Sequence, residues 1–318
     1  LFLKGFRRME NILQWGLDCI RLVQTFANPP LTVCMRIITE LGSAAAYLIL
    51  LPLIYWCVDE KKGIRLATVV LISVWINLSL KFLLNQPRPF FEGYDPSLGM
   101  LSERLGGFPS GHAQNSLVML TIIASWGKRK WFYVSAIVCL LIGFSRIYLG
   151  VHFPTDVFGG WIIGGLLLCA YFLCGKRVEA LLETGGFRAG MIASAALAFI
   201  MILYRPSEEL LMPGGMMLGL GAGYCINKQY IGLSSSALCA NSGIKKYLIL
   251  LGRFVTGFVC MILILAIMGK LISLNPQSGN SPLFNFARFA IAALWVSVGA
   301  PWLFRLLRLT GENKTTDG

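Results

Sequence analysis

The chain has 318 residues, of which 56% are hydrophobic and 14% are charged. Soluble proteins carry about 25% charged residues, so this composition excludes an ordinary soluble domain and indicates an integral membrane protein. The formal net charge of +13 would suggest a nucleic-acid partner in a soluble protein, but in a membrane protein it is typical of basic loops that face the cytoplasm. We therefore expect the bilayer, and no nucleic acid, as a partner.

Residues 10–27 predict a helix that lies in the membrane interface and does not cross it. Polar side chains recur there at helical spacing, which leaves a broad apolar remainder: Asn11, Gln14, Asp18, Arg21 and Thr25. The segment lacks the clean apolar core of a cleavable signal peptide, so we expect none. Asn28-Pro29-Pro30 ends it. We assign residues 1–30 as an amphipathic interfacial segment.

Long apolar runs predict the rest of the fold. A membrane span needs about 20 mostly apolar residues. We expect an all-α, polytopic transmembrane helix bundle of about nine spans, near 32–57, 63–85, 110–127, 131–147, 154–175, 189–204, 212–227, 247–272 and 283–305. The seventh span carries Gly215, Gly219 and Gly223 at intervals of four, a spacing that favours close helix packing.

The basic residues predict which face each loop occupies. Loops after odd-numbered spans and the C-terminal tail hold Lys61, Lys62, Arg65, Lys128, Arg129, Lys130, Lys176, Arg177, Arg188, Lys228, Lys245, Lys246, Arg305, Arg308 and Lys314. The opposite loops hold only Arg88, Arg104, Arg146 and Arg205. By the positive-inside rule the odd loops are cytoplasmic. The basic amino terminus should then lie outside, which is the one discordant feature and which an interfacial helix tolerates.

Ionisable residues at membrane depth indicate function, and a first cluster of them ends the second span. It reads Lys81-Phe-Leu-Leu-Asn-Gln-Pro-Arg88-Pro89. Lys81 stands one turn from the end of the span, and the two prolines break the helix around Arg88. The alternative interpretation is a pair of cations that extend to the interface from a helix end.

A second cluster, Phe108-Pro109-Ser110-Gly111-His112, begins the third span. Ser110 is a favourable N-cap, which places Gly111 and His112 in the first turn. Free N–H groups and the positive end of the helix dipole make such a helix start suited to binding an anion. The alternative is a capped helix with an incidental histidine.

The third cluster comprises Ser145-Arg146 and, after five residues, His152-Phe-Pro-Thr-Asp156. Pro154 fits the first position of the fifth span, so Asp156 falls in its first turn, close to His152. A carboxylate there can accept the imidazole N–H, fix the tautomer and make the other ring nitrogen more basic. The alternative is a structural His–Asp pair.

All three clusters lie at span ends that the charge argument places on the outer face. They contain both histidines of the chain, three cations and an anion-binding helix start, which suits a phosphate group of charge near −2. Two histidines with one nearby carboxylate fall short of a catalytic metal set. The nine cysteines are scattered without a C-x-x-C motif and are interpreted as small core residues. We expect neither a metal nor a cofactor.

The motifs K-x6-R-P at 81–89, P-S-G-H at 109–112 and S-R-x5-H-x3-D at 145–156 resemble those of the type-2 phosphatidic acid phosphatase superfamily. Two spans before the first motif and nine in all are similar to the glucose-6-phosphatase and sphingosine-phosphate phosphatase branch. The resemblance implies a phosphatase core of five spans at 31–178. Residues 179–318 carry no assignable motif and form a membrane extension of about four spans.

The resemblance also implies a role for each matching residue. His152 is the nucleophile that forms a phosphohistidine, Asp156 orients it, and His112 protonates the leaving oxygen and later activates water. The phosphoryl oxygens are held by Lys81, Arg88, Ser110, Gly111 and Arg146. The implied protein is a membrane-embedded, metal-independent phosphatase.

A site on the outer membrane surface favours a lipid phosphate monoester or pyrophosphate as substrate. We expect a bacterial inner membrane with the active site on its outer, periplasmic face. Residues 90–108 form a loop that covers the site or selects the head group, or else a plain connector. Two alternatives stay open: a phosphotransferase of the same family, and a transporter that uses the same polar cluster as a relay. The particular lipid and the oligomeric state are not predicted.

Overall fold

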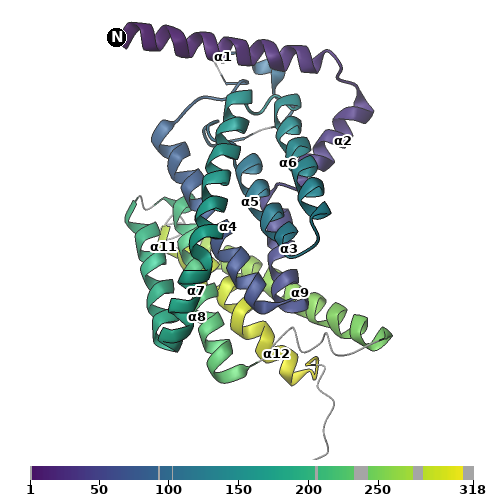
Figure 1. The fold of residues 1–318 in the computed structure, drawn as a ribbon, viewed down its shortest axis with the longest axis vertical. Coiled ribbons are helices and arrows are strands. Elements are labelled where there is room, and N and C mark those ends of the chain that lie inside the picture. Colours follow the sequence, from purple (N-terminus) through teal and green to yellow (C-terminus); the bar gives the residue numbers. More distant parts are fainter. Residues whose placement is uncertain are drawn as a thin grey trace, which may run out of the picture. The chain divides into compact units, whose positions relative to one another are not determined.

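The computed structural model describes residues 2–91, 94–101, 103–204, 207–232, 243–274 and 282–310, with side chains described from Glu10 onward. Every regular element in these residues is helical, which confirms the expected all-α class (Figure 1). In chain order the elements are α1 (Phe2–Gln24), α2 (Pro29–Glu40), α3 (Ala44–Cys57), α4 (Glu60–Leu84), η1 (Pro96–Leu98), α5 (Gly111–Ser125), α6 (Lys130–Tyr148), α7 (Pro154–Tyr204), α8 (Glu208–Ile226), η2 (Asn227–Ile231), α9 (Ile244–Leu274), α11 (Pro282–Leu294), η4 (Trp295–Gly299) and α12 (Ala300–Leu306).

Several helices have the length and composition of membrane spans. Five in the described part of the chain are long and apolar enough to cross a bilayer, and a bent pair, α2 with α3, would make a sixth. α5 and α8 fall outside this set, although both coincide with expected spans. A polytopic helical membrane architecture is therefore confirmed, whereas the number of nine spans stays a prediction.

The first span expected at 32–57 is not a single straight helix. The chain forms two helices that meet at an angle of 46°, with the break between Glu40 and Ala44. Gly42 lies in this break against α5 and α6: a Cβ there would stand 2.9 Å from a methyl group of Ile142 and 3.3 Å from the carbonyl oxygen of His112. We attribute the bend to this close passage of the chain, which leaves no room for a side chain.

The connection expected between the fifth and sixth spans, at residues 176–188, is mostly helical and is interrupted only at Gly186. α7 runs from Pro154 to Tyr204, and the one residue inside it with a non-helical backbone is Gly186, at φ 61° and ψ −149°. The residues before Gly186 are mostly strong helix formers, so the helix continues beyond its apolar stretch. Glu179 and Glu183 on this extension form ion pairs with Arg65 and Lys61 of α4.

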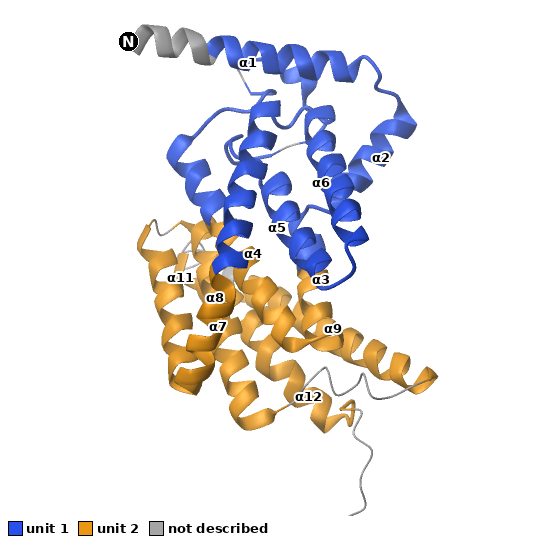
Figure 2. Ribbon diagram, viewed as in Figure 1, with its two compact units in different colours: residues 1–47, 76–173 blue, residues 48–75, 174–318 orange. Residues whose placement is uncertain are grey.

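The chain divides into two compact units (Figure 2). Unit 1 comprises Leu1–Tyr47 and Ile76–Leu173. In it, α1 lies crosswise over the end of the bundle where α6 ends and α7 begins (Figure 2). Leu17 and Ile20 of α1 are buried there with Phe153. The polar residues expected along one side of α1 are all exposed, and the helix ends at Gln24 instead of residue 27.

Unit 2 comprises Leu48–Trp75 and Cys174–Gly318. Its core contains Trp56, Met217 and Phe304. The close packing expected at the glycines of α8 is confirmed, because a Cβ on Gly215 or Gly219 would collide with a carbonyl group of α11. These contacts define an apolar helix bundle.

Candidate active site

Four helix ends of unit 1 bring the three sequence clusters together. α4 ends at Leu84 and α6 at Tyr148, while α5 starts at Gly111 and α7 at Pro154. Hydrogen bonds and ion pairs join the loops next to these helix ends. The structure thereby places all the residues singled out from the sequence at one end of unit 1: Lys81, Arg88, Ser110, Gly111, His112, Arg146, His152 and Asp156.

His152 and Asp156 form the expected pair. Nδ1 of His152 lies 3.2 Å from Oδ2 of Asp156, and both side chains are almost completely buried. Nη1 of Arg88 lies 3.2 Å from the other ring nitrogen, Nε2. Because arginine can only donate, Nε2 must be the acceptor, and the ring proton is then on Nδ1, donated to Asp156. The Nε2 lone pair thus faces Arg88, and this hydrogen bond must open before Nε2 can attack phosphorus.

Electrostatics favour this neutral imidazole. Burial lowers the pKa of His152 well below its usual range, and the nearby cations Arg88, Lys81 and Arg146 lower it further. Burial also lowers the pKa of Arg88, to about 10, against the opposing effect of Glu103, so Arg88 remains cationic at neutral pH. At that pH the His152 ring is therefore neutral, and it donates its Nδ1–H to Asp156.

Asp156 is held by more partners than the sequence indicated. Its Oδ2 also accepts from the backbone N–H of Phe153 at 3.0 Å, and its Oδ1 accepts from Nε2 of Gln86 at 2.9 Å. Gly107 passes so close that a Cβ there would stand 3.0 Å from Oδ2. The sequence analysis did not select Gln86, and its place two residues before Arg88 was the sole local signal.

The start of α5 has the predicted geometry. Ser110 is the N-cap, and its side chain accepts from the backbone N–H of Ala113. Among the described residues, the backbone N–H groups of Gly111 and His112 have no hydrogen-bond partner, as is usual in a first helical turn. The His112 ring is partly exposed and has no hydrogen bond within the same residues. These groups are free to meet a ligand.

Lys81 and Arg88 hold the loop that leads into α5. Lys81 donates to the carbonyl oxygens of Gly106 and Gly107. Nε of Arg88 donates to the carbonyl oxygen of Leu105 at 2.6 Å. Both side chains are buried, so their charges act in a medium of low effective dielectric, where they attract an anion strongly.

Arg146 completes the ring of cations. Its Nη1 donates to Oγ1 of Thr39 at 3.0 Å, and its Nη2 to a carboxylate oxygen of Glu103. Its Nε is buried and has no partner among the described residues. The sequence analysis did not select Glu103 or Thr39. A buried N–H without a partner is costly, and it is a donor that a phosphoryl oxygen would satisfy.

The side chains at this site differ from a set of metal ligands. In the described part of the chain, no group of three or more His, Cys, Asp or Glu side chains could hold a metal ion. The groups that converge here are cations, helix N–H donors and a neutral histidine. Such an arrangement can bind a phosphoryl group and present a nitrogen lone pair to phosphorus.

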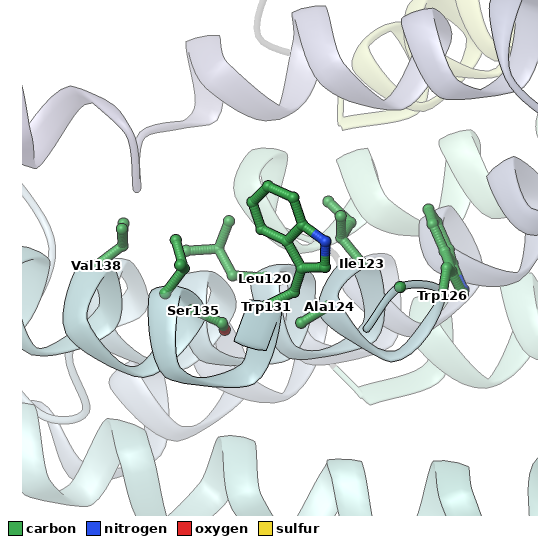
Figure 3. Close-up of a pocket in the computed structure, with 9 residues that line it drawn as sticks. Leu120, Ile123, Ala124, Trp126, Trp131, Ser135 and Val138 are labelled. Carbon is green, nitrogen blue, oxygen red and sulfur yellow. The ribbon is translucent and has the colours of Figure 1, made fainter. Parts of the chain in front are cut away.

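A groove at the far ends of α5 and α6 does not contribute to this chemistry (Figure 3). Its lining is apolar except for Ser135, and includes Trp126 and Trp131. Its nearest lining residue on α5, Leu120, is nine residues from the start of α5 at Gly111, about 14 Å at 1.5 Å per residue. The candidate site is therefore identified by its charged groups, and this groove is not part of it.

Two family models match the chain. The model described as PAP2 superfamily matches residues 62–179, and the one described as PAP2 superfamily phosphatase, transmembrane extension, matches residues 211–313. With the long apolar helices, these matches define an integral membrane phosphatase, a hydrolase of phosphoric monoesters or diphosphates.

Two named relatives agree with this class. Phosphatidylglycerophosphatase B of Bacillus subtilis (strain 168) is 31% identical over 44% of this chain and 73% of its own length. Glucose-6-phosphatase 3 of Bos taurus is 24% identical over 94% of this chain and 92% of its own length. The crystal structure of a transmembrane phosphatidylglycerolphosphate phosphatase from Bacillus subtilis is 25% identical, covers 54% of this chain and 88% of that chain, and has a TM-score of 0.45. The chain belongs to the PAP2 superfamily.

Proposed function

We propose that this protein hydrolyses a lipid phosphate monoester or pyrophosphate through a phosphohistidine intermediate, without a metal ion. The observation that carries the proposal is the position of His152 between Asp156 and Arg88, at 3.2 Å from each. One ring nitrogen is held by a carboxylate, and the lone pair of the other accepts from Arg88, a cation that the phosphoryl group would draw away from it. This is the environment that a nitrogen nucleophile for phosphorus requires.

In the proposed first step, Nε2 of His152 attacks phosphorus and forms a P–N bond while the bond to the leaving oxygen breaks. His112 gives its proton to that oxygen. The leaving group therefore departs with a protonated oxygen, as an alcohol from a monoester or as the lipid monophosphate from a pyrophosphate. In the second step, His112 takes a proton from water, whose oxygen attacks phosphorus. The P–N bond breaks, and inorganic phosphate and free His152 result.

The proposed phosphate site consists of Lys81, Arg88, Arg146, and Ser110 and Gly111 at the start of α5. Their charges and N–H groups would stabilise the equatorial oxygens of the transition state. The unpartnered Nε of Arg146 and the free first-turn N–H groups support this assignment. Asp156 would hold the imidazole in position.

Relatives named for lipid phosphates support a lipid substrate. Besides phosphatidylglycerophosphatase B, they include an undecaprenyl-diphosphatase of Sulfolobus acidocaldarius, 32% identical over 33% of this chain and 51% of its own length. α1 also supports it, because Trp15, Leu22 and Phe26 are exposed large apolar side chains on or beside it. An interfacial helix next to the site would keep a lipid phosphate near it.

A water-soluble sugar phosphate is the second candidate substrate. It is favoured by the match to glucose-6-phosphatase 3, which extends over 94% of this chain. A transporter is disfavoured because the polar residues cluster at the helix ends of unit 1, and Arg253 of the later helices is buried. Its guanidinium donates to the carbonyl oxygens of Leu309, Trp56 and Thr310 within unit 2.

Phosphate release by the purified protein distinguishes these candidates. The panel should contain phosphatidic acid, phosphatidylglycerol phosphate, an isoprenyl pyrophosphate, a sphingoid phosphate and glucose 6-phosphate. We expect lipid phosphates to be hydrolysed with higher kcat/KM than the sugar phosphate. Hydrolysis of glucose 6-phosphate alone would overturn the lipid assignment, and phosphate transfer to an added alcohol with no release would favour the phosphotransferase.

We expect full activity after treatment with EDTA. The reason is that Lys81, Arg88 and Arg146 supply the positive charge that a metal supplies in other phosphatases. The measurement is phosphate release before and after chelation, with added magnesium as the control. Vanadate, which mimics five-coordinate phosphorus, should inhibit competitively. Loss of activity in EDTA with recovery in magnesium would contradict metal independence.

We further propose nine spans, an interfacial residue range of 1–30, a phosphatase core at 31–178 and a membrane extension at 179–318. The site would lie on the outer face of a bacterial inner membrane. The asymmetry of basic residues between the two sets of loops supports this orientation. In unit 1, Lys128, Arg129 and Lys130 stand at the opposite end of α5 from the site.

Cysteine labelling tests the orientation. In a variant with all nine native cysteines replaced, Ser97→Cys should react with a membrane-impermeant maleimide in intact cells, because Ser97 is exposed near the site. The matched control is Lys128→Cys, at an exposed position beyond the other end of α5. It should react only after permeabilisation. The reverse pattern would invert the proposed topology.

A further inference from the structure

Glu103 bridges the two arginines of the candidate site. One of its carboxylate oxygens accepts from Nη2 of Arg146, and the other lies 3.5 Å from Nη2 of Arg88. Both arginine side chains are nearly inaccessible, whereas the Glu103 side chain is 29% exposed. A single carboxylate thus joins guanidinium groups from the loop after α4 and from the end of α6.

The two guanidinium groups need such a bridge. The two buried cations repel each other, and a long arginine side chain has many rotamers. The carboxylate offsets the repulsion and fixes both planes through charge-assisted hydrogen bonds. Without it, each arginine would keep only its contacts to uncharged groups, such as Thr39 for Arg146 and Val151 for Arg88.

Glu103 binds the side of Arg88 that is away from the nucleophile. The Arg88 atom next to Nε2 of His152 is Nη1, whereas the atom next to Glu103 is Nη2. On Arg146 the carboxylate engages Nη2 and leaves Nε without a partner among the described residues. The Nε of Arg146, a donor that we assign to phosphate, therefore remains available while Glu103 is in place.

We propose that Glu103 is a positioning residue, which aligns Arg88 and Arg146 for the phosphoryl group without touching the substrate. The inference rests on the proposed function. It also gives the loop between η1 and α5 a role, because this loop carries the carboxylate that orients the two guanidinium groups. The opposite possibility is that Glu103 occupies the place of the phosphate and must be displaced by it.

The two possibilities predict opposite changes in the affinity of the site for an anion when Glu103 is replaced. Removing a carboxylate from an anion site should strengthen anion binding if the carboxylate competes with the anion. If it positions the arginines, the same change should weaken binding, because the donors are no longer aligned. A misalignment of about 1 Å can cost about 10²-fold in rate.

The test uses the full-length protein in detergent, with Glu103→Gln, Glu103→Asp and a matched control, Asp95→Asn. Asp95 also pairs with an arginine of unit 1, Arg21, at 2.9 Å, but on the surface and outside the site. The readouts are the vanadate inhibition constant, kcat and KM for a lipid phosphate and an aryl phosphate, and the thermal unfolding midpoint.

We expect Glu103→Gln to raise the vanadate inhibition constant about tenfold or more and to lower kcat by about 10²-fold. The loss should be equal for the lipid and the aryl phosphate, since the arginines act on the phosphoryl group and not on the leaving group. Glu103→Asp, which keeps the charge on a shorter side chain, should show a smaller loss. Asp95→Asn should behave like the native protein.

Tighter vanadate binding by Glu103→Gln would show that Glu103 competes with phosphate, and native values would show that it has no role; either result overturns the proposal. If Glu103→Gln does not fold, Glu103→Asp decides in the same way, with a raised inhibition constant in support. Native protein that neither hydrolyses the panel nor binds vanadate would instead refute the proposed function itself.

Discussion

Replacing His152 with alanine is expected to abolish both turnover and the covalent phosphoenzyme. Removing the nucleophile of a covalent mechanism typically costs about 10⁴-fold or more in kcat. In this site no other described nitrogen has the same environment, with a carboxylate on one side and a cation on the other. The measurement is turnover of a lipid phosphate, together with acid-labile phosphohistidine after a rapid quench.

His112→Ala should separate the two histidines. Turnover of an alkyl phosphate should fall by about 10²–10⁴-fold, the usual contribution of a general acid. An aryl phosphate has a good leaving group and needs less protonation, so His152 should still become phosphorylated, slowly. The phosphoenzyme should then persist, because the base that activates water is missing.

The trapping experiment decides between the two assignments. Phosphohistidine that accumulates in His112→Ala and is absent from His152→Ala would support the proposed roles. Label on His112 in the His152 variant would reverse them. The thermal unfolding midpoints of both variants serve as the control, because His152 is buried and its loss leaves Asp156 without one of its partners.

Asp156→Asn is expected to have the second largest effect. The carboxylate accepts the Nδ1–H of His152 and so keeps the proton off Nε2. An amide in its place can donate to Nδ1, and the ring proton then moves to Nε2, where it blocks attack on phosphorus. The analogous change in a Ser-His-Asp triad lowers kcat by about 10⁴-fold, and we expect about 10²–10⁴-fold here.

The cause can be separated from a loss of folding. Asp156 also accepts from Phe153 and Gln86, so Asp156→Asn should cost about 1–3 kcal/mol of stability for its disturbed hydrogen bonds. Vanadate binding should fall much less than kcat if the phosphate donors stay in place. A kcat within threefold of the native value would contradict the role of Asp156. Asp95→Asn, a change of the same type at a partly exposed carboxylate, is the control.

The contacts that were predicted correctly from the sequence are those between residues close together in the chain. Ser110 caps α5 through a backbone group three residues away, and His152 meets Asp156 one helical turn along the chain. Such contacts depend on helix geometry alone, so residue type and spacing are sufficient to predict them. Arg88 and Arg146 were also predicted as site residues, because ionisable residues at membrane depth indicate function.

The residues that were missed have contacts distant in the sequence. Glu103 lies 43 residues from Arg146, and Gln86 lies 70 residues from Asp156. Glu103 has no local signal of its contacts, and the sole local signal for Gln86 is its place two residues before Arg88. The partner of each is defined only when the ends of α4, α5, α6 and α7 meet.

The boundaries of the helices show the same distinction. Hydropathy located the apolar stretches, but it placed a loop after residue 175, where α7 continues to Gly185. A charged stretch of good helix formers can extend a span, and its ion pairs to Arg65 and Lys61 come from another helix. The bend at Gly42 likewise depends on contact with α5 and α6.

The sequence by itself determined the all-α membrane class, the superfamily and the set of candidate catalytic residues, because hydropathy, helix capping and motif spacing act over one or two helical turns. The tertiary structure alone decided which groups surround each of these residues. Packing of four helix ends places Arg88 against His152, Gln86 against Asp156 and Glu103 between two arginines. These contacts join segments far apart in the chain, so they are set by how the helices pack and not by the order of the residues.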